Sequence, residues 1–434
     1  MLYRFQWLIT LLLFVLIQCT AAQDTSDLLR EHAVPFETPD ELSSLADHIT
    51  GERLVLMGEA SHGTSEFYTK RAALSRHLIE NREFNFIAVE GDWSSTSRIN
   101  MYVKHKPGGP ETIDEAMDAI TRWPLWMWKN QEVKELVEWM REYNANLPPE
   151  ERAGFYGIDV YDNYAVMDDV LAWISGIDSD AGRRAANAYS CKTRFSDPGD
   201  YVRMMAQTGQ DCSEDLEEVL ELIRSLENHA DADSWGFFRA EQGAKVAINA
   251  EKHIRGNLRR GSVSWNYRAS HFYQTAERLL DYYGSESRGI VWAHNTHIGD
   301  ARATDMNRRG AHNICQLARE ALGREQVFAI GFGTFTGQVL AASNWEGPME
   351  IMNVPESPPD SWEGMLEATG IETFYLTFDN SELANSLDQW IPHRAIGVTY
   401  NPRNERGNYV QTILPERYDA FIFIRNTGVL TPLE

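Results

Sequence analysis

The segment LVLMGEASHG, residues 54–63, indicates the fold class, because a short apolar run leads directly into a polar loop bounded by glycines. Similar apolar, β-prone runs, separated by amphipathic stretches, recur at residues 86–89, 154–158, 289–292, 327–330, 374–376 and 421–424. Continuous apolar strands that alternate with helices are typical of a parallel sheet that is covered on both faces. We therefore predict an α/β fold with a mostly parallel central sheet and helices on both of its faces.

A long stretch between two of these runs, at about residues 161–285, has a helical pattern. Its apolar positions recur every three or four residues, as in Leu216, Val219 and Ile223. No linker rich in proline, glycine or serine sets this stretch apart from its flanks. We expect a long helical insertion within one domain that spans residues 23–434.

Histidines and charged side chains follow several of the apolar runs, at the points where strands are predicted to end. They are Glu59, His62, Glu90, Asp92, Asp159, His294 and His297. In open parallel sheets ligands bind at the carboxyl ends of the strands, so these residues are expected to converge in one crevice. Carboxylates and histidines are costly to bury together unless they pair or act, which predicts a functional site. A fully paired polar network that caps the sheet is the alternative.

Residues 1–22 have the layout of a signal peptide. Arg4 precedes an apolar run over residues 5–17, and small residues follow at 20–22. The run is shorter than the roughly 20 residues that a membrane-spanning helix needs, which disfavours an uncleaved anchor. We expect export to the periplasm or secretion, without stable membrane insertion once the signal is removed. A lipid anchor at Cys19 is a less favoured alternative.

Three cysteines lie beyond this segment. Cys191 and Cys212 flank a polar stretch, and we predict a disulfide between them because an exported protein meets oxidising conditions. Two buried thiols are the alternative. Cys315 lies in an apolar helical context and is expected in the core. The absence of a Cys-x-x-Cys pattern argues against a zinc finger.

The charge of the chain disfavours polyanionic partners. Its 434 residues include 40 Lys and Arg against 64 Asp and Glu, for a net charge of −24. Such a surface repels phosphate backbones and anionic lipids, so we expect no nucleic-acid partner. The sequence leaves the oligomeric state open.

Four segments occur in an order and at a spacing typical of one enzyme family. They are GEASHGTSEF at 58–67, AVEGDW at 88–93, GFYGIDVY at 154–161 and VWAHNTHIGD at 291–300. On these segments the chain resembles the erythromycin esterase family over nearly its whole mature length. The resemblance implies an α/β core with helical elaborations, and hydrolysis of the lactone ester of macrolide antibiotics such as erythromycin.

The same resemblance implies catalysis by water that a histidine activates, without a serine nucleophile, a metal or another cofactor. The family's functional positions correspond to Glu59, His62, Arg71, Glu90, His294 and His297. We assign the base that deprotonates water to His62, because histidine titrates near neutral pH. Glu59 or Glu90 is expected to orient its ring. Arg71 and one of the two later histidines, which we take to be His294, are expected to stabilise the oxyanion or bind the substrate.

Other residues are predicted to contact the substrate only. They are His297, Asp92, Trp126 and Arg268. Trp126 belongs to an aromatic cluster at 123–128, of which about half is expected in the core and the rest along an apolar cleft. The chain departs from the family pattern at position 269, where alanine follows Arg268 in place of the common aspartate.

Two other interpretations stay open. A metal-assisted hydrolase of another ester would use as ligands Glu59, His62, Glu90, His294 or His297. A non-catalytic exported binding protein, or one related to exopolysaccharides, would keep the fold, since some relatives carry names linked to exopolysaccharide biosynthesis. A pure binder, however, has no chemical reason to keep the whole set of acids and histidines.

Overall fold

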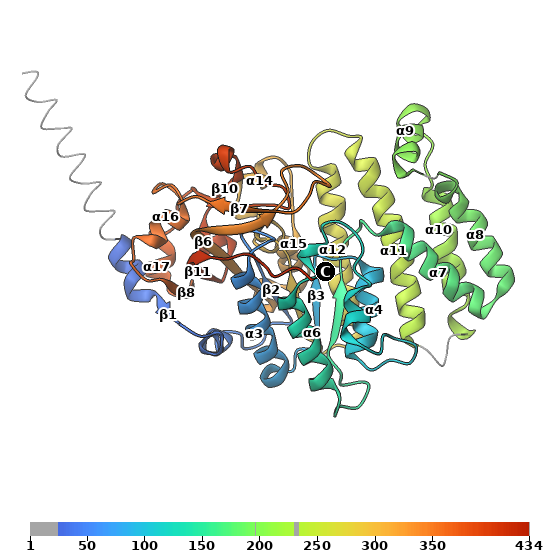
Figure 1. Cartoon of the computed structure of the whole chain (residues 1–434), viewed down its shortest axis with the longest axis horizontal. Coiled ribbons are helices and arrows are strands. Elements are labelled where there is room, and N and C mark those ends of the chain that lie inside the picture. Colours follow the sequence, from blue (N-terminus) through green and yellow to red (C-terminus); the bar gives the residue numbers. More distant parts are fainter. Residues whose placement is uncertain (1–24, 196, 230–233, 434) are drawn as a thin grey trace, which may run out of the picture.

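The computed structural model describes residues 25–195, 197–229 and 234–433, so the predicted signal peptide and Cys19 lie outside the described residues. Its centre is a nine-stranded sheet in the order β1-β8-β11-β6-β2-β5-β3-β4, which β7 joins by pairing with β6 (Figure 1). The strands are β1 (Val34–Pro35), β2 (Leu54–Met57), β3 (Phe86–Val89), β4 (Gly154–Gly157), β5 (Gly289–Trp292), β6 (Val327–Ala341), β7 (Glu350–Val354), β8 (Thr373–Thr377) and β11 (Ala420–Thr427).

The sheet is mostly parallel, as predicted. Strands β2, β3, β4, β5, β6 and β11 run in one direction, whereas β1, β7 and β8 pair antiparallel to their neighbours. A separate antiparallel pair consists of β9 (Ile391–Arg394) and β10 (Tyr409–Thr412). Two details differ from the sequence-based expectation: β6 continues well past residue 330, and the run at 374–376 lies in the antiparallel strand β8.

The four strands that carry the predicted site residues end in register. Met57 lies beside Trp292, and Val89 lies beside both Trp292 and Gly157. The loops after β2, β3, β4 and β5 therefore leave the sheet along one edge, which is where ligands bind in open parallel sheets.

Each buried strand contributes to two cores, because successive side chains point to opposite faces. Leu54 and Leu56 of β2 belong to one cluster with α12 (Val263–Tyr283) and α15 (Ile314–Leu322). Val55 and Met57 belong to the other, with α3 (Ser65–Arg82) and α6 (Gln131–Asn144). Burial on both faces explains why the strands are apolar without alternation.

In the described part of the chain, six α-helices lie between β4 and β5, where the helical insertion was predicted. They are α7 (Asn163–Ile177), α8 (Ser179–Thr193), α9 (Pro198–Thr208), α10 (Ser213–Ser225), α11 (Ser234–Asn257) and α12. Helices α7 to α10 form one end of the molecule, at the right in Figure 1, while α11 and α12 lie nearer the sheet. Leu216, Val219 and Ile223 of α10 are buried, as their spacing predicted.

Shorter helices complete the chain. They are α2 (Ser43–Ala46), α4 (Trp93–Val103), α5 (Ile113–Met117), α13 (Asn295–Ile298), α14 (Asp305–Arg308), α16 (Trp362–Glu367), α17 (Ser381–Ser386) and α18 (Leu414–Arg417). Over the described residues, none of the helices is both long and apolar enough to cross a membrane.

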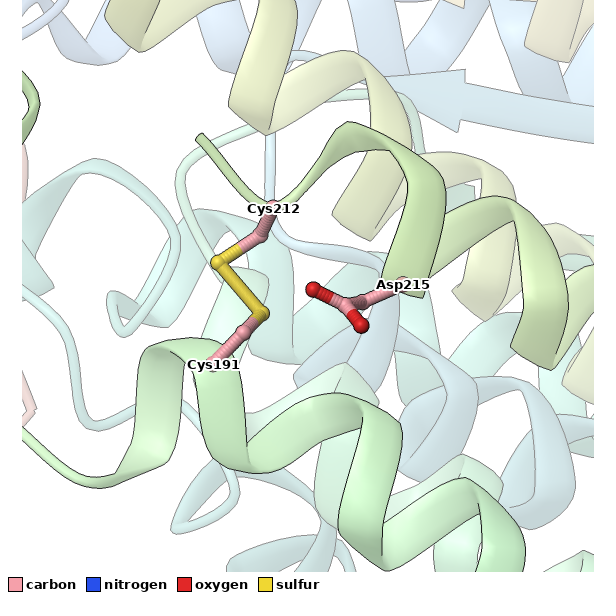
Figure 2. A group of neighbouring side chains, drawn as sticks. All are labelled: Cys191, Cys212 and Asp215. Carbon is pink, nitrogen blue, oxygen red and sulfur yellow. A yellow bond between two sulfur atoms is a disulfide. The ribbon is translucent and has the colours of Figure 1, made fainter. Parts of the chain in front are cut away.

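The predicted disulfide is present. Cys191 in α8 and Cys212, just before α10, are bonded through their sulfur atoms, and their Cα atoms lie 5.9 Å apart (Figure 2). The bond ties two helices of the insertion to each other. Among the residues that the structure describes, Cys315 is the free cysteine, and it is buried in α15 as expected.

Removal of the disulfide by the double substitution Cys191→Ala/Cys212→Ala is expected to lower the free energy of unfolding by about 3 kcal/mol. The bond closes a loop across a separation of 21 residues, which restricts the unfolded chain. Urea unfolding followed by circular dichroism measures the difference. Reducing agent should bring the wild type down to the stability of the double variant, whereas equal midpoints under oxidising conditions would contradict the expectation.

Candidate active site

A cavity of about 380 Å³ opens at the carboxyl edge of the sheet. Its wall includes six of the seven residues that the sequence predicted to converge, together with Arg268, which was predicted to contact the substrate; the seven lining residues are His62, Glu90, Asp92, Asp159, Arg268, His294 and His297. The loops after β2, β3, β4 and β5 supply six of them, and α12 supplies Arg268. The histidines and carboxylates among them are buried, which confines their charges to a site with little water.

The loop after β2 packs closely on its neighbours, and this explains its two glycines. A side chain at Gly58 would overlap the amide of Asn295, and one at Gly63 would overlap the backbone of Leu340. Neither glycine has a positive φ, so close approach rather than an unusual turn requires them. The contact with Asn295 holds the loop of His62 against the segment that begins at His294.

His62 is held from behind by a buried chain of charged groups. Its Nδ1 lies 2.7 Å from Oε1 of Glu59, and Arg71 Nη2 donates to Oε2 of the same carboxylate at 2.6 Å. Arg71 lies in turn against the rings of Tyr68 and Trp292, at 4.4 and 4.6 Å. Of the two carboxylates considered, Glu59 is therefore the one that orients the His62 ring, and Nε2 is the nitrogen left for a ligand.

The environment of His62 favours its protonated form. Burial alone would lower the pKa of His62, but the hydrogen bond with Glu59 and the charges of Glu90 and Glu59 outweigh it, so the pKa is raised. A raised pKa makes the imidazole a stronger base once it has lost its proton. The group is thus suited to take a proton from water.

His294 lies beside His62 and presents the opposite chemistry. Its Nδ1 accepts hydrogen bonds from the hydroxyl and the backbone N–H of Thr296, at 2.8 and 3.3 Å, so the ring proton belongs on Nε2. Burial, together with the charge of His62, holds the pKa of His294 well below its ordinary value. The Nε2–H group is buried and has no hydrogen-bond partner in the described part of the chain. The two rings lie 4.9 Å apart between centroids.

A second charged network forms the far wall of the cavity. Arg268 donates to both oxygens of Asp159, at 2.8 and 2.6 Å, and to Glu90 at 2.8 Å. It also donates to Nε2 of His297 at 3.1 Å. Burial opposes ionisation of Glu90, but the positive charges of the protonated His297 ring and of the Arg268 guanidinium outweigh it and lower the pKa of that carboxyl. Burial lowers the pKa of His297 to about 4, so this ring is neutral at neutral pH.

A sequence profile described as Erythromycin esterase matches residues 79–427, which is most of the chain. This chain belongs to the erythromycin esterase family. The match includes the loops of Glu90, Asp159 and His294, and it begins after the loop of Glu59 and His62.

Similar proteins agree with this membership over nearly the whole chain. YbfO of Bacillus subtilis strain 168, provisionally named a hydrolase, is 19% identical over 429 residues, which cover 92% of the chain and 90% of YbfO. A crystal structure of a succinoglycan biosynthesis protein has a TM-score of 0.78 at 20% identity, covering 94% of this chain and 98% of that one. A mutant of the erythromycin esterase EreC in its open conformation has a TM-score of 0.66 at 17% identity, covering 91% and 95%. These two structures show a shared fold.

Two residues of this erythromycin esterase family member lie elsewhere than the sequence predicted. Arg71 is fully buried behind Glu59 and does not line the cavity, so it reaches the site only through that carboxylate. Trp126 is buried in the core cluster with α3 and α6, while Met127 and Trp128 line the cavity in its place. The prediction of direct ligand contact was wrong for both, because Arg71 in α3 and Trp126 in the 3-10 helix Leu125–Met127 point into the core and not into the cavity.

Several lining residues were not predicted, and three of them contact the charged groups of the site. Arg122 forms a two-bonded ion pair with Asp92, at 2.6 and 2.8 Å. Trp265 stacks on the His297 ring at 4.4 Å, and Tyr161 lies against the Arg268 guanidinium at 4.9 Å. Tyr161 ends a family segment and Trp265 precedes Arg268 by less than one helical turn, so both carried a weak signal. Arg122 carried none.

The departure at position 269 does not alter the cavity wall. Ala269 is fully buried in α12 and is not part of the lining, whereas Arg268 keeps its bonds to Asp159 and Glu90. An aspartate is therefore not needed here for Arg268 to be held in place.

The side chains of the cavity do not fit a metal ion. Three or more ligand atoms within 4.8 Å of one another occur once among the residues described, at Cys191, Cys212 and Asp215 in the helical insertion (Figure 2). Both sulfur atoms of that group are used in the disulfide, so neither is a thiolate ligand. In the cavity, Glu59 and Glu90 face different histidines and are each bonded to an arginine.

Proposed function

We propose that this chain hydrolyses carboxylic esters, with the lactone of macrolide antibiotics as substrate and His62 as the base that activates water. One observation carries the proposal: the Arg71–Glu59–His62 chain ends beside the unpartnered Nε2–H of His294 on the wall of a cavity. A base and a hydrogen-bond donor on one wall are the two groups that ester hydrolysis needs. Membership of the erythromycin esterase family supports the reaction class.

In this mechanism Nε2 of His62 takes a proton from the attacking water. Glu59 accepts from Nδ1–H, fixes the tautomer and stabilises the imidazolium that forms. Arg71 neutralises and orients Glu59, which has no exposed surface of its own. Arg71 and Glu59 are thus positioning residues, and His62 is the group that meets the water.

The neutral ring of His294 suits the developing oxyanion. Its buried Nε2–H makes no hydrogen bond to the described residues, so a carbonyl oxygen bound there would gain one in a water-poor site. The loss of one such donor in a preorganised site is generally costly. Arg268 closes the opposite wall, where it forms an ion pair with Glu90 and donates a hydrogen bond to the neutral His297 ring.

Mass spectrometry of erythromycin incubated with the protein tests the proposal, with and without a chelator. A gain of one water that persists with chelator supports hydrolysis by a metal-free base. Loss of conversion with chelator would favour a metal-assisted hydrolase instead. The absence of conversion of erythromycin would refute the macrolide substrate.

We also propose export from the cytoplasm, which the disulfide supports because such bonds persist in oxidising compartments.

The pH dependence of kcat/KM is expected to show an acid limb that belongs to His62. Only the unprotonated ring acts as a base, so activity should rise with pH through a pKa above the ordinary value of about 6.5. His294 should add no limb near neutrality, since the pKa of its ring is well below the ordinary value. In Glu59→Gln the His62 limb should move to lower pH, because the carboxylate that raises the pKa is gone and burial remains. A limb that stays in place in this variant would contradict the assignment.

A further inference from the structure

The outer wall of the cavity is aromatic, in contrast to its charged floor. Trp345 and Tyr161 line it, with ring centroids 6.2 Å apart, and Trp123, which is not part of the lining, packs on Trp345 at 4.8 Å between centroids. Trp345 lines the cavity and is nevertheless 54% exposed. A large apolar side chain that stays exposed in a cavity marks a surface that a ligand can cover.

The turn that carries Trp345 has an unfavourable backbone. Gly347 N–H donates to the Asn344 carbonyl at 2.9 Å, which closes a four-residue turn between β6 and β7. Its third residue, Glu346, has a φ of 59°, a left-handed conformation that normally selects glycine or asparagine. Such conformations persist where the surroundings enforce them, and they concentrate at functional sites.

A residue from a distant part of the chain, Trp123, enforces this turn. Trp123 Nε1–H donates to the Gly347 carbonyl at 3.0 Å, across a separation of 224 residues. The Trp123 ring also packs edge to face on Trp345. Trp123 thus holds both the backbone of the turn and the indole of Trp345, so Trp345 is a rigid platform rather than part of a loose loop.

The platform is continuous with the charged groups of the site. Tyr161, which contacts Trp345, has the guanidinium groups of Arg122 and Arg268 at 5.1 and 4.9 Å from its ring. Arg268 in turn bonds Glu90 and His297. A ligand that covers Trp345 therefore lies across the same cavity in which His62 and His294 meet the ester.

We propose that Trp345 selects substrates that carry a saturated ring, whose apolar C–H face packs on the indole. This inference rests on the proposed function, because it assumes that the ester of such a molecule reaches His62. Trp345 determines specificity through binding, and it takes no part in proton transfer. The exposed indole, the enforced turn and the position on the cavity wall are the three observations that carry it.

Calorimetric titration of erythromycin tests the inference in a His62→Ala background, in which turnover is suppressed. Addition of Trp345→Ala is expected to raise Kd about tenfold, because the flat contact surface is lost. Trp345→Phe should recover part of the affinity. Trp390→Ala is the matched control: Trp390 is also exposed, at 41%, but it packs on Arg308 away from the cavity lining.

Equal Kd values for the Trp345→Ala and Trp390→Ala proteins would overturn the inference, and so would the absence of erythromycin binding to the His62→Ala background. The proposed function is judged separately, by hydrolysis of p-nitrophenyl acetate with the wild type. Binding that depends on Trp345 without any ester hydrolysis would contradict the proposed function and leave the platform standing. Ester hydrolysis by a protein whose erythromycin binding does not depend on Trp345 would contradict the inference and leave the proposed function standing.

Discussion

Replacement of His62 by alanine is expected to lower kcat for a macrolide lactone by about 10²–10⁴-fold, since a general base contributes a factor of about this size. The fold should survive, because the ring lies on the cavity wall and makes one hydrogen bond, to Glu59. Chromatographic assay of hydrolysed erythromycin at saturating substrate gives kcat. Circular dichroism shows whether the variant is folded.

Two controls separate loss of the base from general damage. His48→Ala removes an exposed histidine that pairs with Asp379 at 3.4 Å, and it should keep wild-type activity. Added imidazole should restore part of the activity of His62→Ala, because a small base can enter the space left by the side chain. Undiminished kcat in folded His62→Ala would show that another group activates the water.

Arg71→Met is expected to destabilise the protein by about 3–5 kcal/mol, since it leaves a buried carboxylate without its cationic partner. Glu59 and Arg71 both have fully buried side chains, and their bond is 2.6 Å long. Methionine preserves much of the packing against Tyr68 and Trp292. Urea unfolding measures the loss, and kcat should fall with it because Glu59 loses the group that orients it.

The same helix offers a matched control. Arg82, at the end of α3, pairs with Asp47 at 2.7 Å near the surface, so Arg82→Met should cost less than about 1 kcal/mol. The double variant Glu59→Gln/Arg71→Met should recover part of the lost stability, because neither buried charge remains. If Arg71→Met proves no more destabilising than Arg82→Met, the buried pair does not stabilise the site.

Several features of the site could be predicted from the sequence because they depend on local pattern and on one rule of topology. The apolar runs at 54–57, 86–89 and 289–292 coincide with β2, β3 and β5. Parallel strands in register place the residues after them at one edge, so the meeting of His62, Glu90 and His294 was predictable. The disulfide of the insertion could also be predicted, from spacing and the expected compartment.

The partners of these residues could not be predicted. The sequence allowed either Glu59 or Glu90 to orient His62, and only the packed loop shows that Glu59 bonds it while Glu90 bonds Arg268. Trp126 and Trp128 are two residues apart and belong to the same buried cluster, yet only Trp128 reaches the cavity wall.

The sequence by itself thus determined the sheet, its helical insertion, the edge that carries the chemistry and the residue types found there. The tertiary structure alone decided which carboxylate holds His62, that Arg71 lies behind it, and that Trp345 meets Trp123 across 222 positions of chain. The physical reason is the separation along the chain between the residues that contact each other. Apolar periodicity records which face of an element is buried, through contacts of neighbouring residues. The direction of a side chain in an irregular loop depends on whichever distant segment packs against it, and no local pattern records that segment.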